Sequence, residues 1–313
     1  MLRSCNNRRL LCGTGRERAA IDRFMLIMSR SLLLLVLHTA QTAAVGPKAR
    51  CADGEWCEKE INGWAKWVLN YRKSHHCEGQ VQTRDLLLSQ SLYNLAGSAK
   101  AVLEVGAWRG CGSTIILAKG LMDQGAGPAT LQTLEVNQER AAEARQVTAG
   151  LPVVNVTAAP AAAAKDILPS VGIKSGPLPP NMHDRDRNEY MKWWRGEHTD
   201  AHKLELAGVR PAIQDLCART AIDVAFLDGG EFYGLADLHA VLRYCPNLRY
   251  IALDDTQTFK NYEALKELLA PGSGWQLCVE DKKERHGWAV VARSVLTTTN
   301  RGGPCGVLTG KIN

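Results

Sequence analysis

The sequence has little net charge outside its first 45 residues, which narrows the partners open to the chain. Residues 1–45 hold seven Arg and no Lys against Glu17 and Asp22, whereas the rest of the chain carries 31 basic and 30 acidic side chains. A near-neutral body argues against a phosphate-binding surface, so we expect no nucleic-acid partner. With 45% hydrophobic residues in a chain of 313, disordered and fibrous classes are excluded as well.

The chain also lacks an apolar run long enough to span a bilayer. Its run at 31–37 follows an Arg-rich segment and precedes small residues at 42–47. A secretory signal has this order: a basic segment, a short apolar run and then small residues. We therefore assign 1–46 as a signal or targeting segment. This predicts a protein of the secretory pathway, or a secreted one, without a stable membrane span. An organelle transit peptide, also rich in Arg and poor in acids, is the alternative.

Cysteine, by contrast, is not scarce. Of ten Cys, eight follow the apolar run, an even number that predicts disulfides in an oxidising compartment and leaves their pairing open. Cys51, Cys57 and Cys77 cluster in an N-terminal arm at 47–84, which a disulfide would tie down. Trp and other apolar residues recur at helical spacing over 55–71 in this arm, which predicts an amphipathic helix packed on the domain.

From residue 100 onward, short β-branched runs alternate with longer helical stretches, which is typical of a parallel sheet with crossover helices. We expect seven strands, at 101–105, 130–136, 153–157, 222–227, 249–253, 275–280 and 288–292. We expect helices at 114–122, 138–148, an Ala-rich stretch ending around 167, 235–244 and 260–269. The predicted fold is α/β, with a Rossmann-like, seven-stranded, mostly parallel sheet, a C-terminal antiparallel hairpin, and helices on both faces.

An insertion at 171–216 interrupts the predicted domain at 85–296, and a tail follows at 297–313. The insertion is too long for a plain connection and too aromatic for a disordered linker. We expect it to be ordered and to lie over the carboxyl ends of the strands, where such sheets bind ligands. Trp193 and Trp194 either stack on a sugar or aromatic acceptor or only pin the insertion to the domain. His198 and His202 are either bases or solvated residues of an exposed loop.

The first strand runs into a turn that contains Gly106, Gly110 and Gly112. A nicotinamide-binding turn needs the pattern G-x-G-x-x-G, but Trp108 and Cys111 stand at its second and third glycine positions. A dinucleotide pyrophosphate is therefore disfavoured. The turn instead brings backbone close to a ligand of another kind.

Two further residues define that ligand. Ser113 and the free amides at the start of the next helix suit a carboxylate. Glu135 ends the second strand, where an acid accepts hydrogen bonds from both hydroxyls of a ribose. The ligand implied has an adenosine-like ribose and a carboxylate but no phosphates, and S-adenosylmethionine fits that description.

The glycine turn, together with the segments 133–135, 226–228 and 253–255, resembles the class I S-adenosylmethionine-dependent methyltransferases. More narrowly, it resembles the group around the catechol and caffeoyl-CoA O-methyltransferases, over roughly 85–293. The resemblance implies that the following residues line the cofactor: Glu104, Gly106, Ala107, Gly110, Ser113, Glu135 and Asp228.

In the catechol-type enzymes a divalent cation is held by an acid after the fourth strand and an Asp-Asn pair after the fifth. The resemblance places Asp228, Asp254 and Asp255 at these positions, so Mg²⁺ or another hard cation is the expected metal. Asp255 stands where the family has Asn, and Glu231 replaces the lysine that the family uses three residues after the first acid. Glu231 is then a general base or a solvated loop residue.

The acids also have simpler interpretations. Asp254 or Asp255 can cap a helix beginning near Thr258. Asp228 can contact the ammonium of the cofactor without any metal, and it is a candidate catalytic residue together with Glu231.

The predicted function is therefore methyl transfer from S-adenosylmethionine to an oxygen of a glycan or a hydroxylated small molecule, with possible assistance from a divalent metal. One alternative is a metal-independent methyltransferase of the same fold, which EDTA would not inhibit. A second alternative, from another class, is a non-catalytic secreted binding protein that keeps the fold.

Overall fold

The computed structural model describes residues 63–77, 86–124, 129–294, 305, 306 and 308. All of them belong to one compact unit, Glu58–Asn313. The predicted signal segment at 1–46, with Cys51 and Cys57 of the arm, lies outside the described residues. Among the described helices, none has both the length and the apolar character needed to cross a bilayer.

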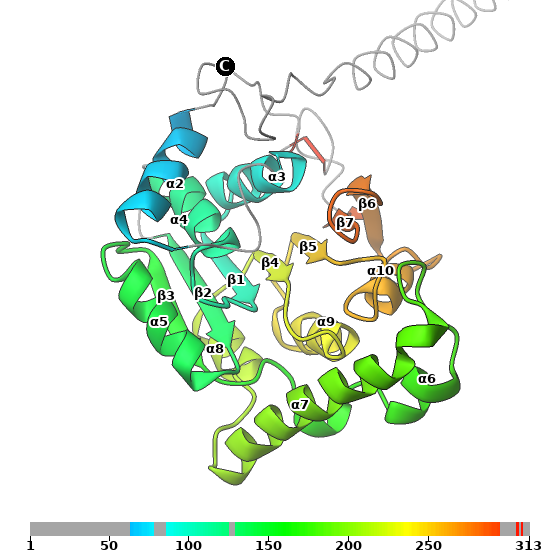
Figure 1. The fold of residues 1–313 in the computed structure, drawn as a ribbon. Coiled ribbons are helices and arrows are strands. Elements are labelled where there is room, and N and C mark those ends of the chain that lie inside the picture. Colours follow the sequence, from blue (N-terminus) through cyan, green and yellow to red (C-terminus); the bar gives the residue numbers. More distant parts are fainter. Residues whose placement is uncertain (1–62, 78–85, 125–128, 295–304, 307, 309–313) are drawn as a thin grey trace, which may run out of the picture. The chain divides into compact units, whose positions relative to one another are not determined.

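A seven-stranded sheet with the order β3-β2-β1-β4-β5-β7-β6 forms the centre of this unit (Figure 1). The strands are β1 (Ala101–Val105), β2 (Thr130–Glu135), β3 (Val154–Ala158), β4 (Val224–Leu227), β5 (Tyr250–Asp254), β6 (Trp275–Asp281) and β7 (Trp288–Arg293). The strands β1 to β5 pair in parallel, whereas β7 pairs antiparallel with both β5 and β6. The predicted fold class and its terminal hairpin are confirmed.

Helices cover both faces of the sheet. One set consists of α2 (Gly63–Ser74), α3 (Leu86–Gly97) and α4 (Ser113–Asp123), and the other of α8 (Ile213–Arg219), α9 (Gly234–Tyr244) and α10 (Tyr262–Leu268). Helix α5 (Gln138–Thr148) lies against β2 and β3. The sequence pattern predicts most of these helices, but it assigns no element to α3.

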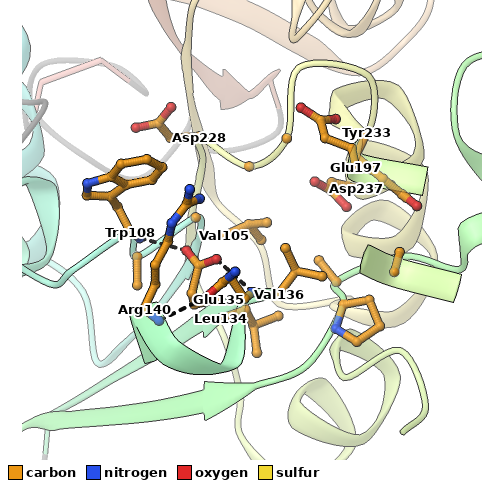
Figure 2. A pocket seen from close by; sticks show the side chains of 18 of the residues that line it. Val105, Trp108, Leu134, Glu135, Val136, Arg140, Glu197, Asp228, Tyr233 and Asp237 are labelled. Carbon is orange, nitrogen blue, oxygen red and sulfur yellow. Dashed lines mark hydrogen bonds between the residues drawn. The ribbon is translucent and has the colours of Figure 1, made fainter. Parts of the chain in front are cut away.

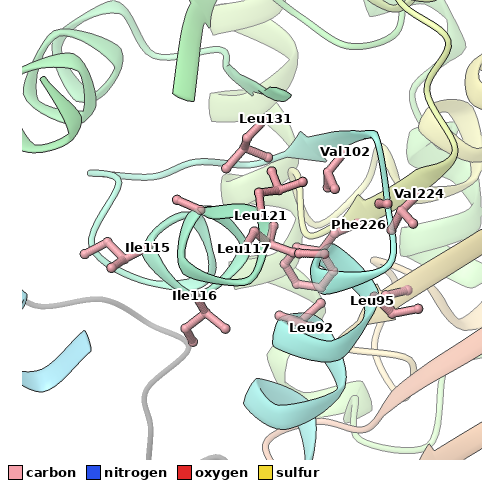
Figure 3. Close-up of a cluster of buried hydrophobic side chains, with 14 of the residues drawn as sticks. Leu92, Leu95, Val102, Ile115, Ile116, Leu117, Leu121, Leu131, Val224 and Phe226 are labelled. Atoms are coloured by element: carbon pink, nitrogen blue, oxygen red, sulfur yellow. The ribbon is translucent and has the colours of Figure 1, made fainter. Parts of the chain in front are cut away.

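Alternation along each strand divides the buried side chains between the two faces. In β4, Phe226 packs with the α3 and α4 side chains Leu92 and Leu117, whereas its neighbours Ala225 and Leu227 pack on the opposite face. Figure 3 shows the first of these clusters, in which leucines of α3 and α4 lie against β1 and β4. The Trp stripe of the arm belongs to the same cluster through the buried Trp64.

The prediction of an Ala-rich helix after β3 is wrong. Only a single turn, η2 (Ala164–Asp166), is helical there. The preceding backbone bonds outward instead of to itself: Ala159 donates its N–H to the Glu135 carbonyl, and the Pro160 carbonyl accepts from Ala212. A high alanine content favours a helix, but Pro160 has no backbone N–H to donate to one. The bonds to Glu135 and Ala212 outweigh the local preference for a helix.

The insertion is ordered, as expected. It contains α6 (Ser170–Ser175), η3 (Asp184–Asp186), the long helix α7 (Arg187–Leu206) and the start of α8. Trp194 is half-buried and its indole donates to the Leu168 carbonyl at 2.7 Å, so this residue pins α7 to the domain, whereas Trp193 is exposed. Glu197 fixes the same helix over the β4 end by accepting from the amides of Glu231 and Phe232 at 2.7 and 3.1 Å.

Three disulfides join described cysteines: Cys77–Cys111, Cys217–Cys245 and Cys278–Cys305. The first ties the arm to the glycine turn, which is a connection that the sequence leaves open. The second joins α8 to the end of α9, and the third holds residues of the C-terminal tail against β6.

Candidate active site

A cavity of about 290 Å³ lies at the carboxyl ends of β1, β2 and β4. Figure 2 shows Glu135 and Arg140 on one side of it and Tyr233, Glu197 and Asp237 on the other. Six residues predicted for the site line it: Gly106, Ala107, Ser113, Glu135, Asp228 and Glu231. Two predicted cofactor residues, Glu104 and Gly110, are not among the lining residues.

The glycine turn brings β1 close to the end of β4. Gly106 has a φ of +96°, and a Cβ at this position would overlap the Asp228 carbonyl. Gly110 has a φ of +76° and packs directly on Ala144 of α5, so its role is to seat the turn on that helix. Trp108 has a φ of +51°, a conformation that is strained for a residue with a side chain.

Glu135 is the best-defined polar group of the cavity. Its carboxylate accepts from the backbone amides of Trp108 and Asn137 at 2.8 and 2.9 Å, and it is only 5% exposed. Burial raises its pKa, and these hydrogen bonds and the nearby Arg140 oppose that rise. A carboxylate has about four acceptor sites, so acceptor capacity remains for a ligand in the cavity.

Arg140 and Trp108 form the wall beside Glu135. The Arg140 guanidinium carbon lies 3.6 Å from the centre of the Trp108 ring, a cation–π contact that holds both side chains at the edge of the cavity. Neither residue is among the site residues predicted from the sequence.

Glu104 lies beneath the cavity. It is fully buried and accepts hydrogen bonds from three hydroxyls, Ser113 at 2.5 Å, Thr114 at 2.7 Å and Thr133 at 2.6 Å. These bonds tie β1 to α4 and β2. The structure therefore places Glu104 as a support for Ser113 and the turn, outside the contact surface that the resemblance implies.

The side of the cavity opposite Glu135 is acidic. Asp237, in the first turn of α9, is 2% exposed, and its Oδ1 has no hydrogen-bond partner within the described part of the chain. Burial, together with the neighbouring Glu197, raises its pKa well above the ordinary value, which favours the protonated form of its carboxyl. The buried hydroxyl of Tyr233 is likewise without a partner among these residues.

The three acids predicted as metal ligands do come together. Single carboxylate oxygens of Asp228, Asp254 and Asp255 lie within 4.8 Å of one another. Two cationic side chains that the sequence analysis misses are paired with them. The Lys260 ammonium lies 2.7 Å from Asp228 Oδ1 and 2.6 Å from Asp255 Oδ2, and Arg285 Nη2 lies 2.8 Å from Asp254 Oδ2.

These ion pairs set the charges of the cluster. Burial alone would lower the pKa of Lys260, but Asp228 and Asp255 outweigh it and hold that pKa well above its usual range. Burial raises the pKa of Asp255, and the contact with Lys260 outweighs it, so the net shift is downward. Lys260 and Asp255 are therefore both charged near neutral pH.

A divalent ion does not fit the cluster with Lys260 in place. An ion bound at about 2.1 Å from Asp228 Oδ1, the oxygen that Lys260 contacts at 2.7 Å, would lie at most about 5 Å from the Lys260 ammonium. At an effective dielectric constant of about 20, their repulsion is roughly 7 kcal/mol. The three carboxylates already face two internal cations, Lys260 and Arg285, so little uncompensated charge is left to attract such an ion.

The alternative of a helix cap is not what the structure shows for Asp254 or Asp255. Helix α10 begins at Tyr262 after Asn261. Asn261 is fully buried and donates to the carbonyls of Leu227 and Asp254, which holds the ends of β4 and β5 together.

Glu231 lines the cavity and interacts electrostatically with Lys260 and Asp255 of this cluster. Its buried Oε1 has no hydrogen-bond partner among the described residues. Burial raises its pKa to about 7, an effect that Lys260 opposes. The histidines proposed as bases, His198 and His202, stack on α7 and do not line the cavity.

No model of a known protein family matches the chain, and no curated protein matches it. Among solved structures, a Bacillus cereus O-methyltransferase in complex with SAH has 16% identity and a TM-score of 0.43, and covers 74% of this chain and 91% of its own. The SAH-bound Podospora anserina methyltransferase PaMTH1 has 12% identity and a TM-score of 0.45, with 76% and 92% covered. The SAM-bound O-methyltransferase TomG from Streptomyces achromogenes has 15% identity and a TM-score of 0.42, with 75% and 91% covered.

The strand order and the reversed β7 are those of the Rossmann-like fold of class I methyltransferases. At such low identities and TM-scores, the comparisons carry no argument about the chemistry of this chain. The function proposed below therefore rests on the geometry of the cavity.

Proposed function

We propose that this protein is an S-adenosylmethionine-dependent methyltransferase that acts on an oxygen acceptor. The observation that carries the proposal is the buried Glu135 carboxylate, which two backbone amides orient beside a cavity at the carboxyl end of β2. The acceptor capacity that remains on this carboxylate suits neighbouring hydroxyls, as on a ribose. Gly106, where a side chain would overlap the β4 end, keeps the floor of this cavity open.

The methionine part of the cofactor fits the region between Ser113 and Asp228. Helix α4 begins directly after the glycine turn and has no side-chain cap, so its first amides suit a carboxylate. Asp228 lines the cavity and contacts Lys260 through Oδ1, which leaves its other carboxylate oxygen to accept from an ammonium. When bound, the cofactor supplies an electrophilic methyl group on its sulfonium. The protein supplies orientation, which is the larger part of catalysis in an in-line displacement.

The adenine end fits the opposite side of the cavity, between the small residues Ala159 and Ala161 and the acidic wall. Adenine presents an amino donor beside a ring-nitrogen acceptor. A protonated carboxyl offers a donor and an acceptor together, and burial and Glu197 favour that form of Asp237 by raising its pKa. We therefore assign recognition of the adenine edge to Asp237, a residue of α9 that the methyltransferase motifs do not include.

Glu231 is the proposed general base. An oxygen acceptor becomes a better nucleophile when it loses its proton, and a carboxylate with a pKa of about 7 is matched to that task near neutral pH. Its unpartnered Oε1 is the atom that would take the proton. Lys260 stays protonated and so cannot serve as this base.

We also propose that the protein acts in the secretory pathway or outside the cell. The three disulfides support an oxidising compartment, and they agree with the order of basic, apolar and small residues at 1–46. A glycan or a hydroxylated small molecule is the acceptor class to test there.

The first test is calorimetric titration of the full chain with S-adenosylmethionine. Wild type should bind with micromolar affinity, and Glu135→Lys should weaken binding at least about 100-fold, because a cation replaces the acceptor of the ribose hydroxyls. Glu139→Lys is the matched control, because Glu139 is exposed, four residues after Glu135, and outside the cavity. The affinity of this variant for the cofactor should stay at the wild-type value. Equal affinities in all three proteins would rule out the ribose assignment.

A further inference from the structure

The carboxylate cluster after β4 and β5 holds its counter-charge within the chain. Asp228, Asp254 and Asp255 bring oxygens within 4.8 Å of one another, as a hard cation requires. Each of these acids nevertheless contacts a cationic side chain at 2.6–2.8 Å. The donor set of a metal site is present, and internal cations already pair with it.

Lys260 is the central one of these cations. It lies between β5 and α10, its side chain is 9% exposed, and its backbone N–H bonds the Thr258 hydroxyl at 3.2 Å. Its ammonium bridges Asp228 and Asp255, which come from two different strand ends. It also lines the cavity that contains Glu135 and Glu231.

The hydrogen-bonding capacity of Lys260 leaves room for a ligand. An ammonium has three N–H donors. Asp228 and Asp255 accept two of them, so one donor remains on a group that already borders the cavity.

We propose that Lys260 takes the place of a divalent metal in this protein. Its ammonium neutralises the acids and binds the acceptor oxygen through its third N–H, next to Glu231. The role of Lys260 in binding the acceptor rests on the proposed function. The exclusion of the metal does not depend on it. It also defines the acceptor: one hydroxyl held at a single point, because an ammonium cannot chelate two adjacent hydroxyls as a metal ion does.

Arg285 completes the arrangement. It lies in the turn between β6 and β7, where its φ is +57°, and pairs with the fully buried Asp254. The β5 loop is fixed to the same turn, since Thr256 and Gln257 donate their N–H groups to the carbonyls of Gly287 and His286. The third acid of the cluster is therefore paired through the terminal hairpin, independently of Lys260.

The test measures Mn²⁺ binding to the full chain through the paramagnetic resonance signal of free Mn²⁺. Thermal unfolding of the same samples is measured in parallel. Wild type should leave Mn²⁺ free and unfold at the same temperature with Mn²⁺ or EDTA. Lys260→Ala should bind one Mn²⁺ per chain at least about tenfold more tightly and gain thermal stability from it. Lys266→Ala, which removes an exposed lysine of α10, should behave as wild type.

Saturable binding of one Mn²⁺ by wild type, lost in Asp254→Asn, would overturn the proposal. The wild-type measurement decides this even when Lys260→Ala does not fold, and Lys260→Met, which keeps the length of the apolar stem, provides a second variant. Titration of the same samples with S-adenosylmethionine in EDTA separates the two hypotheses. Loss of cofactor binding contradicts the proposed function, whereas Mn²⁺ binding by wild type contradicts only the role of Lys260.

Discussion

Two groups of buried carboxylates lie at the carboxyl edge of the same sheet, and they are neutralised in different ways. Glu135, at the end of β2, accepts from two backbone amides and borders the cavity. Asp228 and Asp255, after β4 and β5, are bridged by the side chain of Lys260. The neutral amides leave Glu135 with acceptor capacity for a ligand. The positive charge of Lys260, in contrast, already neutralises Asp228 and Asp255, so they need no external cation. Strand position alone therefore marks where acids gather, but not what they bind.

The largest effect should come from closing the glycine turn on the Glu135 side. Gly106→Ala places a Cβ against the Asp228 carbonyl at a positive φ, which should destabilise the fold by roughly 4–5 kcal/mol and abolish cofactor binding. Gly150→Ala is the control, because a Cβ there meets nothing within 4 Å. Chemical denaturation and calorimetry measure both quantities. A Gly106→Ala protein as stable as the control would show that the turn is not packed as described.

On the Lys260 side, removal of the internal cation should be nearly as costly. Lys260→Ala leaves Asp228 and Asp255 buried without their partner, so the unfolding free energy should fall by roughly 3–5 kcal/mol. Lys266→Ala breaks only an exposed pair with Glu263, so its urea midpoint should stay at the wild-type value. Similar urea midpoints for the two variants would contradict the buried bridge.

The disulfides distinguish effects on folding stability from effects on cofactor binding. Cys77→Ser and Cys278→Ser open loops of 34 and 27 residues, so each should cost roughly 3–4 kcal/mol by the chain-entropy model. Only Cys77–Cys111 includes the glycine turn, so Cys77→Ser should also weaken cofactor binding, by several-fold. If Cys278→Ser weakened binding as much as Cys77→Ser, the disulfide in the turn would have no specific role.

The smallest effect concerns the pH dependence of Glu231. Its folded-state pKa is raised from 4.5 to about 7, so its contribution to stability is fully present below about pH 4.5 and lost as the pH rises through 7. Glu231→Gln should therefore gain stability relative to wild type between pH 5 and pH 8, by on the order of 1–3 kcal/mol. Urea unfolding at both pH values checks this, with Glu139→Gln as the exposed control. A pH-independent difference would place Glu231 in solvent.

The sequence predicts the centre of the sheet well because β1, β4, β5 and β7 are short, mostly apolar runs that are buried on two faces. The same logic fails at 159–163, where the alanines favour a helix. Instead, Ala159 donates its N–H to the Glu135 carbonyl, the Pro160 carbonyl accepts from Ala212, and residues 159–162 line the cavity. Helix α3 was absent from the prediction because its Leu-rich stretch carries no motif, although four of its residues, Leu88, Leu92, Leu95 and Ala96, are fully buried.

Part of the site is predictable for a similar reason. Gly106, Glu135 and Asp228 lie directly at strand ends, and parallel strands bring those ends together. Lys260 and Arg285 lie 32 and 31 residues from Asp228 and Asp254, in loops whose paths no periodicity determines. Asp237 gives no signal either, since it is a single acid in the first turn of an ordinary helix.

The most direct test of the account is a crystal structure of the full chain grown with S-adenosylhomocysteine and MnCl₂, with an anomalous difference map at the manganese edge. The account predicts ribose hydroxyls within hydrogen-bond distance of Glu135, Lys260 between Asp228 and Asp255, and no anomalous peak at the carboxylate cluster. A ligand placed away from Glu135, or manganese bound by Asp228 and Asp255 with Lys260 displaced, would contradict it.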